Sequence, residues 1–200
     1  MMIKTKEDLR RVLSADAKYY LRNTFRKRLL DNIFCRERII IWRYVQVMRY
    51  CEYYTNNKKK SFIHSFLYWW YLRKHNKNCV KYGLLIGASA FQEGLCIYHL
   101  GNIVVNGYCK IGKNCKLHGS NCIGNSRLKD DCPVIGDNVR LGVGAKVFGN
   151  VFIANNVTIA AGAVVNKSCY EDGATLAGVP AKIVKHGTSK TENISNNTDL

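Results

Sequence analysis

Apolar residues recur at every sixth position through the second half of the chain. The spacing holds in two unbroken series, Val105, Ile111, Leu117 and Ile123, and then Ile135, Leu141, Val147, Ile153, Ile159 and Val165. Gly or Ala often follows directly, and a second small or β-branched residue often stands four positions later. Six is not a helical period. A short repeat sustained over this length predicts a solenoid, in which each unit buries its apolar face by stacking on its neighbours.

Each six-residue unit suits one flat face of a triangular coil, so three units predict a turn of about eighteen residues. Asn114, Asn138, Asn150 and Asn156 fall where tight corners are expected, and Asn and Gly adopt positive φ at little cost. The pattern resembles the hexapeptide-repeat transferase superfamily, whose fold is a left-handed parallel β-helix, an exception to the usual right-handed crossover. We therefore predict a mainly β fold, with this β-helix over residues 83–185.

The repeat is interrupted once, between Ile123 and Ile135. The intervening position of the series is Lys129, within the polar segment 126–133. Because a charged side chain cannot point into an apolar core without a partner, we predict that residues 125–133 form a loop extruded from the coil. Loops on rigid scaffolds often carry function.

The front of the chain differs in composition. Residues 1–82 hold 20 Lys and Arg against 6 Asp and Glu, with all three Trp, whereas every Gly lies at or after Gly83. Thr5, followed by two acidic residues, is typical of a helix start, and residues 39–54 and 61–77 are predicted helices. We expect a small, basic, aromatic-rich α-helical domain over residues 1–82. Residues 186–200 are expected to form a flexible tail.

The sequence argues against export and against a membrane span. The first eleven residues lack the apolar core of a secretory signal, and Arg43, Arg49 and Arg73 interrupt the longest apolar stretches. The nine Cys show no C-x-x-C pair and no zinc spacing, so most are interpreted as small buried fillers in a reduced, cytoplasmic setting.

Two histidines are the candidate catalytic residues. His99 and His118 are the only His within the repeat, and a spacing of one coil plus one residue predicts that they lie on adjacent coils near one edge. Histidine is the natural general base near neutral pH. Two rings on coils about 4.8 Å apart can share one cleft.

The segments around these residues resemble serine acetyltransferases. The run from Gly94 to His99, with the Gly-Asn-Ile-Val-Val that follows, is similar to the segment that ends in that family's catalytic His, and residues 133–150 and 177–182 are similar too. The closest likeness is to shorter enzymes of capsule and polysaccharide gene clusters. The resemblance implies acetyl-CoA as co-substrate, His99 as general base, His118 as a second active-site group, and a homotrimer with its sites between subunits.

Three positions depart from the pattern of the cysteine-pathway enzymes. Tyr98 and Leu84 stand where that family has Asp, and Cys132 stands where it has a loop His. The group that orients His99 is therefore left open, with Asp130 or Asp131 of the loop as candidates. The acceptor is also open: a sugar or serine-like hydroxyl in surface-polysaccharide synthesis leads, and L-serine is the alternative.

The resemblance also implies where acetyl-CoA binds. Small residues at two corners would let the pantetheine arm approach the backbone, lysines would pair with the phosphates, and the segment that closes the last coil would cover the adenine. The residues in question are Gly142, Gly144, Ala145, Ala160, Ala161, Lys167, Ala177, Pro180 and Lys182. Carbonic-anhydrase-like members of the superfamily bind zinc through a His pair five residues apart, which this sequence lacks, so no metal is expected.

The basic front leaves several interpretations open. It is a helical cap that packs on the β-helix and aids trimerisation, or a peripheral patch that contacts anionic membrane. No nucleic-acid-binding module is present in the sequence, so a nucleic-acid partner is not expected. A catalytically silent β-helix scaffold at membranes is the alternative of a different class.

Overall fold

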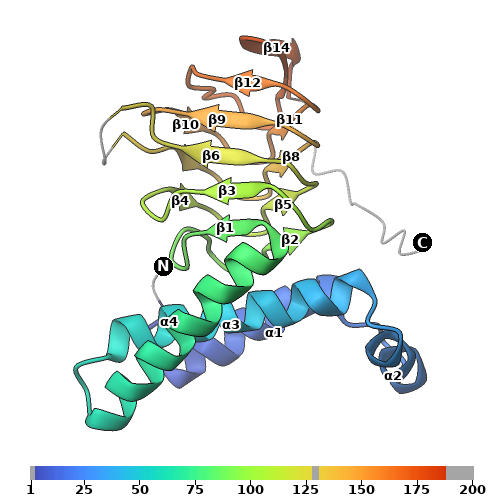
Figure 1. Cartoon of the computed structure of the whole chain (residues 1–200). Coiled ribbons are helices and arrows are strands. Elements are labelled where there is room, and N and C mark those ends of the chain that lie inside the picture. The colour runs from blue at the N-terminus through green and yellow to red at the C-terminus, as the bar shows by residue number, and fades with distance from the viewer. Residues whose placement is uncertain (1–2, 128–130, 188–200) are drawn as a thin grey trace.

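The computed structural model describes residues 3–127 and 131–187. A stack of coils with short strands rests on a layer of helices, and the chain passes once from the helices into the stack (Figure 1). The last helix ends at Tyr82, Gly83 closes it in the left-handed conformation with φ of 65°, and the first strand begins at Leu84.

The coils form three faces, which we number in the order in which the chain first enters them after Gly83. The chain enters face 2 at Phe91, which forms an isolated bridge with Ile111, before it reaches β2 on face 3. Face 1 contains β1 (Leu84–Ile86), β3 (Ile103–Val105), β6 (Cys122–Gly124), β9 (Lys146–Phe148) and β12 (Val164–Val165). Face 2 contains β4 (Lys110–Ile111), β7 (Val134–Ile135) and β10 (Phe152–Ile153). Face 3 contains β2 (Cys96–Ile97), β5 (Lys116–Leu117), β8 (Arg140–Leu141), β11 (Thr158–Ile159), β13 (Thr175–Gly178) and β14 (Ala181–Lys185).

Strands from successive coils pair in parallel on every face, and among the described strands only the terminal β13–β14 hairpin is antiparallel. The architecture matches the left-handed β-helix, which confirms the predicted fold class.

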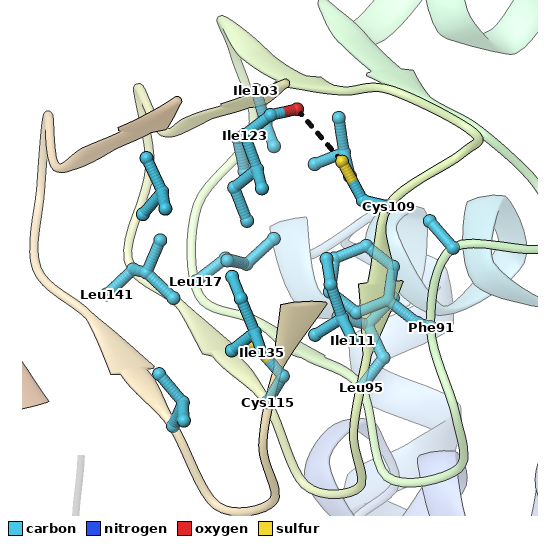
Figure 2. Packing of buried hydrophobic residues seen from close by; sticks show 14 of the residues in the cluster. Phe91, Leu95, Ile103, Cys109, Ile111, Cys115, Leu117, Ile123, Ile135 and Leu141 are labelled. Carbon is cyan, nitrogen blue, oxygen red and sulfur yellow. Dashed lines mark hydrogen bonds between the residues drawn. The ribbon is translucent and has the colours of Figure 1, made fainter. Parts of the chain in front are cut away.

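The predicted inward positions form the core. All ten residues of the two six-residue series are at most 3% exposed. The smaller residues four positions later are buried as well, among them Cys109 and Cys115. Figure 2 shows these side chains stacked in layers inside the coil, where the Cys109 thiol donates to the Ile123 carbonyl oxygen at 3.7 Å. The repeat therefore encodes one continuous apolar column.

The corner between faces 2 and 3 is built from asparagines. Asn114, Asn138 and Asn156 have φ of 55°, 58° and 59°. The amide of Asn114 donates to Asn138 at 3.0 Å, and that of Asn138 donates to Asn156 at 3.1 Å. Asn150, predicted at a corner, is not among the positive-φ residues described; the preceding Gly149 takes this conformation with φ of 84°.

A loop leaves the coil at the corner between faces 1 and 2. β6 ends at Gly124 and β7 begins at Val134. Ile123 pairs with Val147, and Val147 pairs with Val165, so the coil that contains the loop is one six-residue unit longer than the next coil. Ser126 donates a hydrogen bond to Asp131 across the base of this loop. Lys129 lies outside the described residues.

Four helices precede the coil: α1 (Lys6–Tyr20), α2 (Phe25–Ile33), α3 (Glu37–Asn57) and α4 (Phe62–Tyr82). The start of α1 is the one that the sequence predicts, because Thr5 and Asp8 form a reciprocal capping box. The helices predicted at 39–54 and 61–77 are confirmed but longer. The short α2 was not predicted.

Polar side chains of the helices close the open end of the first coil, which has no earlier coil to pair with. Asp16 accepts hydrogen bonds from the backbone N–H groups of Gly94 and Leu95 at 2.7 and 2.9 Å. Arg49 donates to the Phe91 and Gln92 carbonyl oxygens at 2.8 and 2.7 Å, and to Asp16 at 2.8 Å. Buried backbone groups need partners, and here the helices supply them.

Two further observations concern the setting of the chain. None of the helices over the described residues is long and apolar enough to cross a bilayer. All nine cysteines are described and free of disulfides; seven are buried, Cys122 is partly buried and Cys35 is exposed. The predicted tail falls mostly on residues 188–200, which lie outside the described part of the chain.

Candidate active site

One edge of the β-helix, the corner between faces 3 and 1, gathers most of the predicted site residues. The backbone N–H of the residue that follows a face-3 strand donates a hydrogen bond to a backbone carbonyl oxygen of the next coil. Tyr98 donates to Leu117, His118 to Leu141, Gly142 to Ile159 and Ala160 to Leu176. These bonds stack Tyr98, His118, Gly142 and Ala160 in one column, which Ala177 continues in register. We call this set the corner column. It runs from the helical end of the coil toward the β13–β14 hairpin.

The two histidines lie on neighbouring coils of this edge but are offset by one residue. β2 and β5 pair with Ile97 opposite Leu117, so His118 lies opposite Tyr98 and His99 lies beside Gly119. The rings of Tyr98 and His118 stack with their centroids 4.3 Å apart and a 17° interplanar angle. The coil is longer here than eighteen residues, and therefore Tyr98 takes the position directly beneath His118.

His118 is held in its neutral form. Burial lowers the pKa of its imidazole, and the neighbouring Arg140, His99 and Lys116 lower it further. Its Nε2 atom is buried and has no hydrogen-bond partner among residues 3–127 and 131–187. An unpaired buried ring nitrogen is unfavourable, and such atoms are common at functional sites.

His99 is exposed and has a carboxylate partner from the helical domain. Its side chain is 67% exposed, and its Nδ1 lies 3.3 Å from Oε2 of Glu37 in the first turn of α3. The other carboxylate oxygen of Glu37 accepts the backbone N–H of Leu100 at 2.7 Å. Sequence reasoning missed this residue, because the contact joins positions 62 residues apart and no local motif marks it.

The small residues predicted for acetyl-CoA lie along the same edge. Gly142 and Ala160 belong to the corner column, Ala161 is exposed beside it, and Gly144 has φ of 71°. A Cβ on Gly142 would lie 2.6 Å from the Ala161 nitrogen, so the two coils approach here as closely as a glycine allows. Ala145 points into the core with no exposed surface.

The hairpin residues meet the end of the column. Ala177 pairs with Lys182 across β13 and β14, and the exposed Pro180 lies in the turn between them. Lys167 does not join this group, because it follows β12 on face 1 and lies toward the opposite corner.

The loop leaves the coil at a different corner from the one that carries the histidines, and two of the departing residues are buried. Asp131, a candidate for orienting His99, accepts a hydrogen bond from Ser126, and the loop leaves the coil at the corner between faces 1 and 2. Asp130 is outside the described residues. Leu84 and Cys132 are buried in the core. The carboxylate that contacts His99 is that of Glu37.

Within the described ranges, no group of three or more His, Cys, Asp or Glu side chains is arranged to hold a metal ion.

Curated proteins resemble about half of the chain. A serine acetyltransferase of Staphylococcus aureus (strain Mu50 / ATCC 700699) is 38% identical over 93 residues, 46% of this chain and 43% of that protein. The serine acetyltransferase of Buchnera aphidicola subsp. Schizaphis graminum (strain Sg) is 30% identical over 110 residues, 54% of this chain and 42% of that protein. The match thus spans less than half the length of these relatives. No protein-family model matches the chain.

Solved structures resemble nearly the whole chain. The crystal structure of serine acetyltransferase from Brucella abortus strain S19 superposes with a TM-score of 0.71 at 25% identity, over 92% of this chain and 72% of that chain. Its complex with coenzyme A gives 0.69 at 26% identity, over 92% and 70%. The enzyme from Neisseria gonorrhoeae gives 0.66 at 26%, over 91% and 67%. The chain therefore resembles serine acetyltransferases in both sequence and fold.

Proposed function

We propose that the protein transfers the acetyl group of acetyl-CoA to a hydroxyl group, with His99 as the general base. The observation that carries the proposal is the edge of the coil that carries the corner column, where His118 of the column, the neighbouring His99 and a line of small residues lie together. The likeness to serine acetyltransferases supports the same chemistry.

In this mechanism the proton moves through Nε2 of His99. The imidazole accepts the proton of the acceptor hydroxyl while the oxygen attacks the thioester carbonyl carbon, and it returns the proton to the departing thiolate. Nδ1 faces Glu37, so Nε2 is the nitrogen turned toward an acceptor. His118, kept neutral, is proposed to position the acceptor or to stabilise the developing negative charge on the carbonyl oxygen.

Acetyl-CoA is proposed to lie along the corner column. Gly142 and Ala160 are partly exposed and Ala161 is exposed, so only small residues line this edge where the narrow pantetheine arm would lie. A solved serine acetyltransferase of the same fold is described in complex with coenzyme A. The exposed Lys182 of the hairpin is proposed to contact a phosphate at the far end. Lys167 remains a candidate only if a neighbouring subunit brings its corner to this edge.

L-serine is the acceptor that we propose to test first. The comparisons favour L-serine over the sugar in surface-polysaccharide synthesis that leads the sequence-based expectations, because the curated relatives and solved structures quoted above are serine acetyltransferases. The sugar stays in the test because Tyr98 and Leu84 replace two acidic residues of that family's pattern.

The experiment is a thiol-release assay with acetyl-CoA and a panel of acceptors, L-serine first and then sugars. We expect release to depend on an acceptor and to fall at least 100-fold in His99→Ala. The matched control is His186→Ala, because His186 is an exposed histidine that also contacts a glutamate, away from the corner column. Full activity in His99→Ala, or no acceptor-dependent release with any acceptor, would overturn the proposal, and the second result would favour the scaffold.

We further propose a homotrimer in a reducing, cytoplasmic compartment. The resemblance implies the trimer, and nine cysteines that form no disulfides support the compartment. Light scattering on the purified protein should give three times the 22.8 kDa mass of one chain. A monomer at micromolar concentration would contradict the trimer.

We also propose that the outer surface of α2 and α4 contacts anionic membrane. Large apolar side chains stand exposed there, Phe25, Ile33 and Phe34 on or beside α2, and Phe62, Ile63, Phe66, Trp69 and Trp70 on α4. Basic residues lie among those of α2 at 26–28 and flank those of α4 at 58–60 and 73–74, and such a combination of apolar and basic residues is typical of interfacial helices. The protein should float with phosphatidylserine vesicles at low salt and not with neutral vesicles. No flotation at low salt excludes the contact.

A further inference from the structure

We infer that Glu37 is the positioning residue of His99. Its carboxylate reaches the imidazole from the helical domain and takes the orienting role that no acidic residue of the coil fills in the described part of the chain. The inference rests on the proposed function, because it concerns the base that this function requires.

The two contacts of Glu37 fix the tautomer of the imidazole. A carboxylate only accepts hydrogen bonds, so Nδ1 of His99 must carry the proton that faces Oε2. In the neutral ring Nε2 is then left unprotonated, which is the form that a general base needs. The 3.3 Å separation is long for a hydrogen bond, and catalytic contacts of this kind commonly shorten when substrate binds.

The carboxylate is itself held in place. Oε1 accepts the Leu100 N–H at 2.7 Å, which ties Glu37 to the backbone next to His99. Glu37 begins α3, where the helix N-terminus favours a negative charge. Its two neighbours, Arg36 and Arg38, reach the buried carboxylate of Asp31 at 3.3 and 3.1 Å, which anchors the turn. A positioning group must be rigid, and these contacts supply the rigidity.

The chain contains a second pair with the same contacts, at the end of the coil where the terminal hairpin lies. Glu171 lies 3.0 Å from Nδ1 of His186 and accepts the Gly187 N–H at 2.7 Å. The two pairs differ in their surroundings. His99 lies next to the corner column and acts electrostatically on His118, whereas His186 follows the terminal hairpin. Because of this likeness, Glu171→Gln is a matched control for Glu37→Gln.

The test compares Glu37→Gln, Glu37→Ala and Glu37→Asp in the full-length protein. The Gln amide keeps its carbonyl oxygen for Leu100 but offers an N–H to Nδ1 of His99, which moves the ring proton to Nε2. We expect kcat to fall about 10- to 100-fold in Glu37→Gln with KM for acetyl-CoA unchanged. Glu37→Asp should recover part of the loss, and Glu171→Gln should match the wild type.

The comparison of Gln with Ala separates positioning from a structural role. If Glu37 acts through the tautomer, Gln is at least as damaging as Ala, because Ala imposes no wrong tautomer. Ala more damaging than Gln, or unchanged kcat in Glu37→Gln, overturns the inference.

Nitrogen-15 NMR of labelled histidine reports the tautomer without turnover. The His99 signal, assigned by its loss in His99→Gln, should show a protonated Nδ1 in the wild type and a shift toward protonated Nε2 in Glu37→Gln. An unchanged tautomer contradicts the inference even if the protein shows no acetyltransferase activity, so the two proposals fail separately.

Discussion

In the coil, the inward side chains are almost all apolar and recur every sixth residue. The helices also pack apolar side chains on the coil, but add buried charged and hydroxyl groups that contact it. Leu141 and Ile159 have no exposed surface and pack against like residues above and below. Arg49 and Asp16 are equally buried but contact backbone groups of the first coil. An interior coil finds backbone partners on its neighbours. The first coil lacks one neighbour, and polar side chains replace it.

The largest expected effect comes from removing this polar closure. Arg49→Ala leaves the buried Asp16 without its cation and two carbonyl oxygens without donors. We expect a loss of about 3 to 5 kcal/mol in the free energy of unfolding, measured with denaturant. The control is the exposed Arg43→Ala, for which a change within about 0.5 kcal/mol is expected. Equal losses in the two variants would show that the closure is not what holds the domains together.

Removing one layer of the apolar column should have a somewhat smaller effect. Leu141→Ala deletes a fully buried side chain between two neighbouring coils, and we expect a loss of about 3 kcal/mol. The matched control is Leu85→Ala, because Leu85 is 52% exposed and points outward from β1. Denaturant unfolding of both variants measures the difference. A Leu85 variant as unstable as the Leu141 variant would mean that the outward positions also pack against something.

These two regions also differ in how far the sequence predicts them. Inward positions follow from the period alone, and so do the corners at Asn114, Asn138 and Asn156. The polar closure does not, because Asp16 and Gly94 are joined by folding over 78 residues with no local pattern. In the sequence, Arg49 is only an interruption of an apolar stretch, and nothing marks it as buried.

The candidate site also combines residues that the repeat predicts with a residue that it does not. The repeat brings His99 and His118 to one edge, since both lie in the coil. It misplaces them by one residue, because the first complete coil is longer than eighteen residues and aligns Tyr98 with His118. The repeat cannot predict Glu37, because Glu37 belongs to the helical domain. The short α2 that precedes Glu37 in the chain is not predicted for the same reason.

A smaller effect, which depends on pH, is expected at the junction of the two regions. His75 of α4 is buried, and one ring nitrogen lies 3.0 Å from the Ile86 carbonyl oxygen of β1. Burial lowers its pKa below the ordinary 6.5, so below that pH the unfolded chain binds the proton more readily than the folded one. The contribution of neutral His75 to the free energy of unfolding is therefore fully present above about pH 6.5 and is lost as the pH falls.

Unfolding at pH 5 to 8 measures this slope. His75→Gln keeps an N–H for the Ile86 carbonyl oxygen and should make the slope shallower. The groups around His75 are Tyr44, with ring centroids 5.7 Å apart, and the thiol of Cys79 at 3.5 Å. Neither carries charge in this range, because burial raises the pKa of both. His118, whose pKa is also lowered, keeps part of the slope in the variant. An unchanged slope in His75→Gln is the result that contradicts this account.

The smallest expected effect concerns a corner of the coil, where the backbone and not the side chain sets the requirement. Asn138 has φ of 58° and links its neighbours in the asparagine ladder. Both Asn138→Ala and Asn138→Gly lose the ladder hydrogen bonds, but only Ala is strained at this φ. We expect Ala to be about 1 kcal/mol less stable than Gly in denaturant unfolding, although Ala is the better residue at ordinary positions. If Asn138→Ala is as stable as Asn138→Gly, the ladder of hydrogen bonds, and not the backbone conformation, explains the asparagines. This corner would then resemble the junction between the helices and the first coil, which polar side chains hold together.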